Sequence, residues 1–134
     1  MPDGVYAYDA VGKSKVPDVV GQLVRVGGRE EMKKIVAAFP DKDFAEEAPL
    51  IYIFTGLLER SVWHYREAAY AQVMQDVGAC AASVMLHSKS KGAKVFALGG
   101  FVDDEIAVTL NLPVTEIPLA ALAVFPEYSE LAFD

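Results

Sequence analysis

Two short stretches of the sequence carry residue types that could do chemistry, and the first is residues 63–66, Trp-His-Tyr-Arg. It places two aromatic rings, an imidazole and a guanidinium next to one another. An imidazole can accept or donate a proton near neutral pH, and a tyrosine hydroxyl can do the same in a suitable environment. The plainer interpretation is a helix end packed on a sheet, with Trp63 and Tyr65 in the core. Both interpretations stay open on these residues alone.

The second stretch is residues 94–113, in which an apolar strand ends at the pair Gly99 and Gly100. An aromatic residue, an acidic group and a short predicted helix follow. Paired glycines at a strand end have two explanations: the backbone turns there, or a flat ligand lies against it where a Cβ would not fit. The acidic group is expected to cap the helix through Asp103 or Asp104.

The other reactive side chains are isolated from one another. His64 and His87 are the only histidines and lie on one predicted helix, too far apart for the close pair that a zinc site usually needs. No metal site is therefore predicted. Cys80 lies among alanines in the middle of that helix and is expected to be a buried, unreactive thiol. The sequence contains no nucleophile-elbow, phosphate-loop or dinucleotide-binding motif.

Composition predicts a single globular domain over residues 1–134, since 53% of the residues are apolar and 23% are charged. The net charge is −7. Nucleic-acid binding needs clustered lysine and arginine, so a nucleic-acid partner is not expected. No apolar run reaches the ~18 residues of a membrane span, and the first residues do not resemble a signal peptide. With only one cysteine, the chain is expected to be cytoplasmic, without membrane contact.

Periodicity predicts an α+β chain of four or five strands and three or four helices. Strands are expected at residues 4–9, 19–28, 50–56, 93–100 and 116–126, and helices at 29–39, 61–90 and 103–112. The near-continuous apolar run 50–56 is typical of a central strand covered on both faces.

The predicted helix 61–90 is the longest element and would span roughly 40 Å. Ser61 is its expected N-cap, and Gly92 its expected stop. Small side chains run along it and would let another backbone approach closely: Ala68, Ala69, Ala71, Gly78, Ala79, Ala81 and Ala82. This seam predicts a central packing helix that meets another subunit.

The order of five segments resembles the nitroreductase superfamily, nearest its SagB-type branch, whose members oxidise azoline rings in modified peptides. The segments are "PDGVYAYD" at 2–9, "LVRVGGREEM" at 23–32, "AEEAPLIYIFTG" at 45–56, the helix at 63–92 and "GGFVDDEIAVTLNLPVTEIPLAALAV" at 99–124. They correspond to the C-terminal two-thirds of the family fold.

The resemblance implies a three-layer α+β fold, with a mainly antiparallel sheet and a long central helix, that lacks the N-terminal part. It also implies an oxidoreductase with FMN at a subunit interface, acting on a small molecule or a modified peptide. His64 and Tyr65 stand where azoline-oxidising members carry a Lys-Tyr pair, so they would transfer protons. The residues expected to lie against the flavin are Leu98, Gly99, Gly100 and Phe101.

The sequence also departs from the family pattern. The segment that grips the FMN phosphate in the family would precede the first matched segment, and residues 123–134 contain no lysine or arginine. Three alternatives follow. The first is a flavoenzyme, as a homodimer or paired with a chain that supplies the missing N-terminal part. The second is a degenerate, non-catalytic relative that dimerises or binds a small ligand without FMN. The third is a truncated copy or designed fragment of a longer parent.

Overall fold

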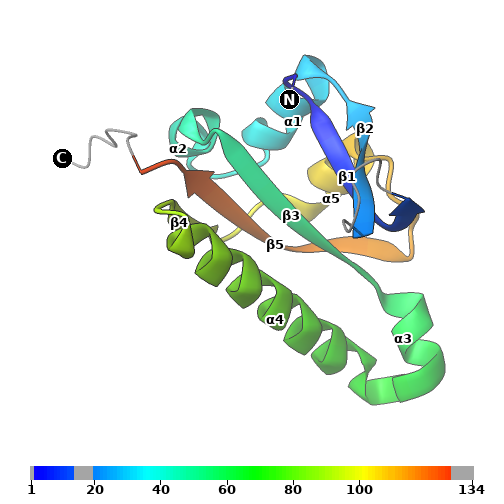
Figure 1. Ribbon diagram of the computed structural model, residues 1–134. Coiled ribbons are helices and arrows are strands. Elements are labelled where there is room, and N and C mark those ends of the chain that lie inside the picture. Colours follow the sequence, from blue (N-terminus) through cyan, green and yellow to red (C-terminus); the bar gives the residue numbers. More distant parts are fainter. Residues whose placement is uncertain (1, 14–19, 128–134) are drawn as a thin grey trace.

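The computed structural model describes residues 2–13 and 20–127 (Figure 1). Its strands form two antiparallel sheets, a two-stranded one of order β1-β2 and a three-stranded one of order β3-β5-β4. The predicted α+β class with a mainly antiparallel sheet is confirmed. In chain order the elements are β1 (Val5–Lys13), β2 (Val20–Gly27), α1 (Arg29–Ala37), α2 (Lys42–Glu47), β3 (Leu50–Leu57), α3 (Leu58–Tyr65), η1 (Arg66–Ala68), α4 (Ala69–Ser90), β4 (Lys94–Leu98), α5 (Asp103–Thr109) and β5 (Glu116–Phe125).

The three-stranded sheet is the middle of three layers, as the resemblance implied. Helix α4 lies across one face, and α1, α2 and α5 lie on the other side (Figure 1). On the α4 face the contact is close: a Cβ added to Gly56 of β3 would come within 2.7 Å of a Val73 side-chain carbon of α4. On the opposite face, Ile51 and Ile53 pack against the main core cluster.

That core cluster joins the helices of the second face to β5. Its buried members come from α1, α2, α5, the α1–α2 connection and β5: Ile35, Ala38, Phe39, Ala45, Ile106 and Ala121. Ile106 is 0% exposed. Separately, Phe44 of α2 packs on the rings of Phe96 of β4 and Phe125 of β5, with centroids 5.5 and 5.2 Å away. Alanines in β5 allow the helices to approach the central strand closely.

Helix α1 begins after Gly28 with a local capping interaction. The Gly28 N–H donates to the Glu31 carboxylate at 2.8 Å. This hydrogen bond and the N–H of Glu31 itself stabilise the ionised form, so the pKa of Glu31 lies below its ordinary value. The Glu31 carboxylate already accepts from the Gly28 N–H, as in a capping box. The turn at Gly27 and Gly28 therefore serves to start helix α1.

We expect Glu31→Ala to lower the melting temperature at neutral pH, because α1 loses this hydrogen bond. A folded-state pKa below the unfolded one stabilises the fold above the unfolded pKa, and that stability is lost as the pH falls through the folded pKa. The difference in melting temperature should therefore narrow on acidification. Calorimetry from neutral to acidic pH measures this, with Glu30→Ala in the same turn as control. A gap that stays constant with pH would contradict the capping role.

The strand order corrects one prediction. Strand β3, predicted to be central, lies at the edge of its sheet, and the central strand is β5. Every position of β5 is at least half-buried, whereas Leu50, Tyr52 and Leu57 of β3 are exposed. An apolar run indicates that both faces of a strand are covered, and it does not distinguish a central strand from an edge strand.

The long helix is also divided, where one continuous helix had been predicted over residues 61–90. Arg66 has φ +49° and ψ −121°, a backbone conformation that non-glycine residues rarely adopt and that interrupts the helix between α3 and α4. Ser61 is not an N-cap, because α3 already begins at Leu58. The expected stop at Gly92 is confirmed, since α4 ends at Ser90 and Gly92 has φ +79°. The long central helix is therefore α4 alone.

The expected cap of α5 is wrong in detail. The N-cap position belongs to Val102, and no side chain caps the helix. Asp103, Asp104 and Glu105 occupy the first turn, where their negative charges interact favourably with the exposed N–H groups and the helix dipole.

Candidate functional site

The glycine turn follows β4 and leads into α5. Gly100 has φ +79°, a conformation in which glycine is favoured. The backbone turn is therefore sufficient reason for a glycine at position 100. On either side the turn is anchored: Leu98 and Phe101 pack against the core cluster, and the Phe101 ring lies edge-on to Phe39 with centroids 5.8 Å apart. The flanking residues thus fix the position of an exposed backbone segment.

Gly99 has a different explanation from Gly100. A Cβ added at either glycine would meet no atom of the described chain within 4 Å. Packing within the described chain therefore does not require a glycine at position 99, and its backbone is open to a ligand or a partner chain. The carboxylates in the first turn of α5 lie just beyond and make this side of the turn acidic.

The His64–Tyr65 pair lies on α3, which has no buried residue. The two rings meet edge to face, with centroids 4.9 Å apart. Trp63 is 87% exposed and Tyr65 is 48% exposed, so the interpretation of both as core residues is wrong. The exposed apolar side chains of α3 therefore form a surface on which a partner could pack.

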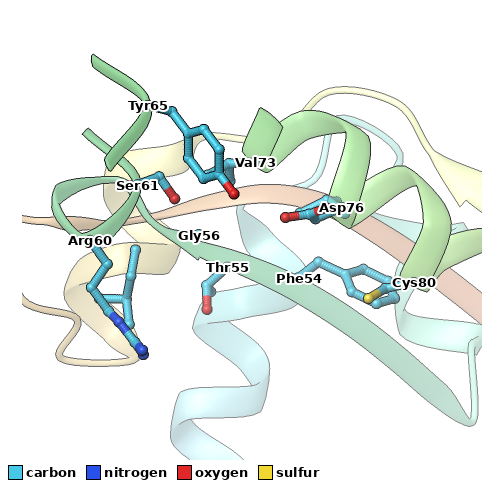
Figure 2. A pocket seen from close by; sticks show the side chains of 11 residues that line it. Phe54, Thr55, Gly56, Arg60, Ser61, Tyr65, Val73, Asp76 and Cys80 are labelled. Carbon is cyan, nitrogen blue, oxygen red and sulfur yellow. The ribbon is translucent and has the colours of Figure 1, made fainter. Parts of the chain in front are cut away.

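Tyr65 lines a pocket of about 450 Å³ between β3, α3 and α4. Figure 2 shows Phe54 and Thr55 coming from β3, Arg60 and Ser61 from α3, and Asp76 and Cys80 from α4. The pocket is lined by apolar side chains, among them Val73, and by a few polar groups, a composition typical of small-molecule sites. It is also within the volume range of such sites.

Cys80 is exposed and lines this pocket, which corrects the prediction of a buried thiol. The side of α4 that carries it remains uncovered within the described chain. Arg60 and Asp76 are pocket residues that the sequence analysis does not predict. A usable signal was present, because Val73, Asp76, Val77 and Cys80 recur at three- and four-residue steps and therefore share one side of the helix.

A single chain does not bring the two predicted groups together. Phe101 packs in the core on the side of α1 and α5, while Tyr65 lines the pocket on the α4 side of the sheet. They also belong to opposite edges, since β3 leads into α3 and β4 leads into the glycine turn. None of the residues Leu98–Phe101 lines the pocket that holds Tyr65. The site-residue assignments of these two groups remain predictions.

Two further features concern metals and membranes. Over residues 2–13 and 20–127, no three His, Cys, Asp or Glu side chains are grouped as a metal site would require. No helix in the same ranges combines the length and the apolar character needed to cross a bilayer.

Comparison with known proteins gives consistent matches. Residues 4–124 match the Nitroreductase family. A protein of Methanocaldococcus jannaschii assigned to the nitroreductases is 28% identical over 124 residues, which are 92% of this chain and 58% of that protein. The chain thus spans little more than half the length of this curated relative.

Solved structures share the fold. The structure of B. megaterium NfrA2 superposes with a TM-score of 0.64 at 20% identity, covering 77% of this chain and 47% of that one. A Staphylococcus epidermidis protein assigned as an NAD(P)H:FMN oxidoreductase gives 0.60 at 18% identity, covering 80% and 66%. Since the family match extends over most of the sequence and over both candidate groups, the chain belongs to the nitroreductase family.

Proposed function

We propose that this chain is an FMN-linked oxidoreductase whose flavin lies at a subunit interface. The observation that carries the proposal is the glycine turn of a nitroreductase-family chain, with an open backbone at Gly99 and Gly100 and an anchor at Phe101. Backbone N–H groups in such a turn can stabilise negative charge on a flat, electron-accepting ring. FMN, when bound, supplies hydride and electron transfer.

The residues fit one part of FMN better than another. The open turn Leu98–Phe101 is suited to the edge of the isoalloxazine ring, because no Cβ at Gly99 or Gly100 blocks a close approach. The phosphate fits less well here, since Asp103, Asp104 and Glu105 are negatively charged and lie next in the chain. A second copy, or a further part of the fold, would supply the phosphate contacts.

We place the pair His64 and Tyr65 at the site of a second copy. Within one chain these residues and the glycine turn belong to opposite faces of the sheet. Helix α3 has no buried residue and carries exposed apolar side chains, as expected for an arm that packs on a partner. A homodimer would then join the glycine turn of one copy to the aromatic segment of the other.

We expect Trp63→Glu to weaken this homodimer strongly, because a charge would replace the most exposed aromatic ring of α3 at the interface. Hot-spot tryptophans typically contribute at least about 2 kcal/mol, which corresponds to roughly a thirtyfold loss of affinity. Light scattering over a dilution series measures the change. Val114→Glu is the control, because Val114 is 98% exposed and lies in the turn before β5. A clean monomer without any substitution would contradict the dimer.

His64 and Tyr65 are assigned to proton transfer. The imidazole nitrogens and the phenolic oxygen are each able to hold or release a proton, and the edge-to-face contact of the two rings fixes their relative orientation. Small-molecule acceptors such as quinones and nitroaromatics, and modified peptides as in the azoline-oxidising branch, are the substrate classes compatible with an open site.

The double variant His64→Ala, Tyr65→Phe tests this assignment. Loss of a positioned acid or base typically slows the reaction by about 10² to 10⁴. We expect a decrease in kcat of that order with FMN binding retained, measured with a reduced nicotinamide donor and an acceptor series. Unchanged turnover would exclude both residues from proton transfer.

The second candidate function is that of a non-catalytic subunit that dimerises or binds a small ligand without FMN. The acidic first turn of α5 beside the glycine turn favours it, because a dianionic phosphate is repelled there. A protein that dimerises and shows no FMN binding would support this alternative.

A further inference from the structure

The end of β3 that carries α3 extends beyond the third strand of its sheet. Strand β4 pairs only with residues 121–125 of β5, whereas β3 continues along β5 as far as the pair Leu57 and Glu116. This end is therefore a two-stranded ladder, and α3 begins directly after it at Leu58 (Figure 1). Two paired strands support each other less well than three. The position of α3 thus depends on what holds this ladder together.

The backbone pairing of the ladder is weakened near its middle. The register of β3 against β5 shifts between Phe54 and Thr55, and the residue of β5 that pairs with Thr55 is Pro118. Proline has no N–H group, so β5 cannot donate a ladder hydrogen bond from this position. A register shift also disrupts the ladder locally. The last pairs of the ladder, and α3 beyond them, are therefore attached through a weak point.

One side-chain hydrogen bond crosses the ladder beyond this point. The Thr55 hydroxyl donates to the Glu116 carboxylate at 2.5 Å, and both residues are half-buried. Hydroxyl groups that donate to charged carboxylates form bonds of this length, which are stronger than bonds between neutral groups. Next to it, the Leu58 N–H donates to the Thr115 carbonyl at 3.2 Å. Together the two bonds join the junction of β3 and α3 to the start of β5.

Helix α3 lacks the anchors that hold its neighbour α4. Val73 and Val77 of α4 are buried, and Val73 lies close to Gly56 of β3. No residue of α3 is buried. The positive φ of Arg66 also breaks the helical path to α4, so α4 does not fix α3 as a continuous helix would. The orientation of α3 on the sheet therefore depends on the junction with β3.

We propose that Thr55 and Glu116 are positioning residues, whose hydrogen bond fixes α3 and its pair His64 and Tyr65 against the sheet. The Thr55 hydroxyl points away from the side chains of Tyr65 and Asp76, so it acts through α3 (Figure 2). A displacement of about 1 Å can slow a reaction by roughly a hundredfold. The effect on catalysis rests on the proposed function, in which the pair transfers protons, whereas the attachment of α3 does not.

The test is Thr55→Val, which keeps the shape of the side chain and removes the hydroxyl. Exchange of the Leu58 amide reports opening of the junction, and the fluorescence anisotropy of Trp63, the only tryptophan, reports motion of α3. We expect this amide to exchange at least about tenfold faster, since a hydrogen bond to a charged group is lost. The anisotropy should decay to a lower limit. Neither readout involves FMN.

The expected effect on the reaction is a decrease in kcat of about tenfold or more, with KM and FMN affinity unchanged. Thr55→Ser keeps the hydroxyl and should restore kcat, the slow exchange and the anisotropy. Thr115→Val is the matched control, because it removes a neighbouring hydroxyl that takes no part in this bond. It should behave like the unsubstituted chain in every readout. Circular dichroism checks that all three variants fold.

The outcomes separate this inference from the proposed function. Unchanged exchange and anisotropy in Thr55→Val would overturn the attachment of α3 by this bond. A looser α3 with unchanged kcat would overturn the positioning role, if His64→Ala, Tyr65→Phe does lower kcat. If that double variant leaves turnover unchanged, the proposed proton transfer is wrong, and exchange and anisotropy still decide whether the bond holds α3.

Discussion

Gly99→Val is expected to fold like the unsubstituted chain and to lose affinity for FMN by at least about a hundredfold, or ~2.7 kcal/mol. An added Cβ at this position meets no atom of the described chain within 4 Å, so the fold can accept the side chain. The branched side chain would instead occupy the space in which the proposed site needs the ring edge to approach the backbone. Quenching of FMN fluorescence measures the affinity, and circular dichroism checks the fold.

A nearby substitution provides the control for this variant. Val108→Ala removes two methyl groups from an 80% exposed side chain on α5, the helix that follows the turn. It should leave FMN affinity unchanged. If Gly99→Val bound FMN as tightly as Val108→Ala does, the glycine turn would not belong to the flavin site.

Ile106→Ala is expected to have the largest effect on stability. Ile106 is 0% exposed and belongs to the cluster that joins α1, α2, α5 and β5. Replacing a buried isoleucine by alanine removes apolar contacts and leaves a cavity, at a cost of about 2–5 kcal/mol. Urea unfolding measures the free energy of unfolding, and the midpoint should fall substantially.

The matched control for stability is again Val108→Ala, two residues along the same helix. Its side chain is exposed, so the free energy of unfolding should change by no more than about 0.5 kcal/mol. Equal effects of the two substitutions would mean that α5 is not packed against the sheet as described.

The sequence pattern predicted those helices and strands whose structure depends mainly on their own residues. The alternating Tyr-Ala-Tyr of β1, the apolar spacing of α1 and the stop at Gly92 depend on neighbours in sequence. Strand order does not depend on neighbours in sequence, because it is set by pairing between distant segments. For this reason the apolar run of β3 could not be placed at an edge from sequence alone.

The break at Arg66 shows a second limit of sequence patterns. Residues 61–90 contain no proline, and the residues around the break are ordinary helix formers, so no local signal marks the change of direction. The positive φ of Arg66 allows α3 to leave the axis of α4. Strain of this kind is accepted when tertiary structure or function requires it.

The residues of the candidate site could be predicted from the sequence, but their arrangement in space could not. Composition and spacing drew attention to His64, Tyr65 and the glycine pair. They could not show that these groups lie on opposite faces of the sheet, which is the reason that the proposed site uses a second copy. Cys80 had been assigned to the core because it is surrounded by alanines, yet nothing in the described chain covers it.

The most direct test of the central claim is a titration of FMN with the purified chain, followed by flavin fluorescence and by the visible absorption spectrum. We predict saturable quenching with a flavin-like spectrum for the bound form, and a loss of both in Gly99→Val. A folded chain that neither carries flavin nor quenches added FMN would contradict the proposed oxidoreductase and would favour the non-catalytic subunit.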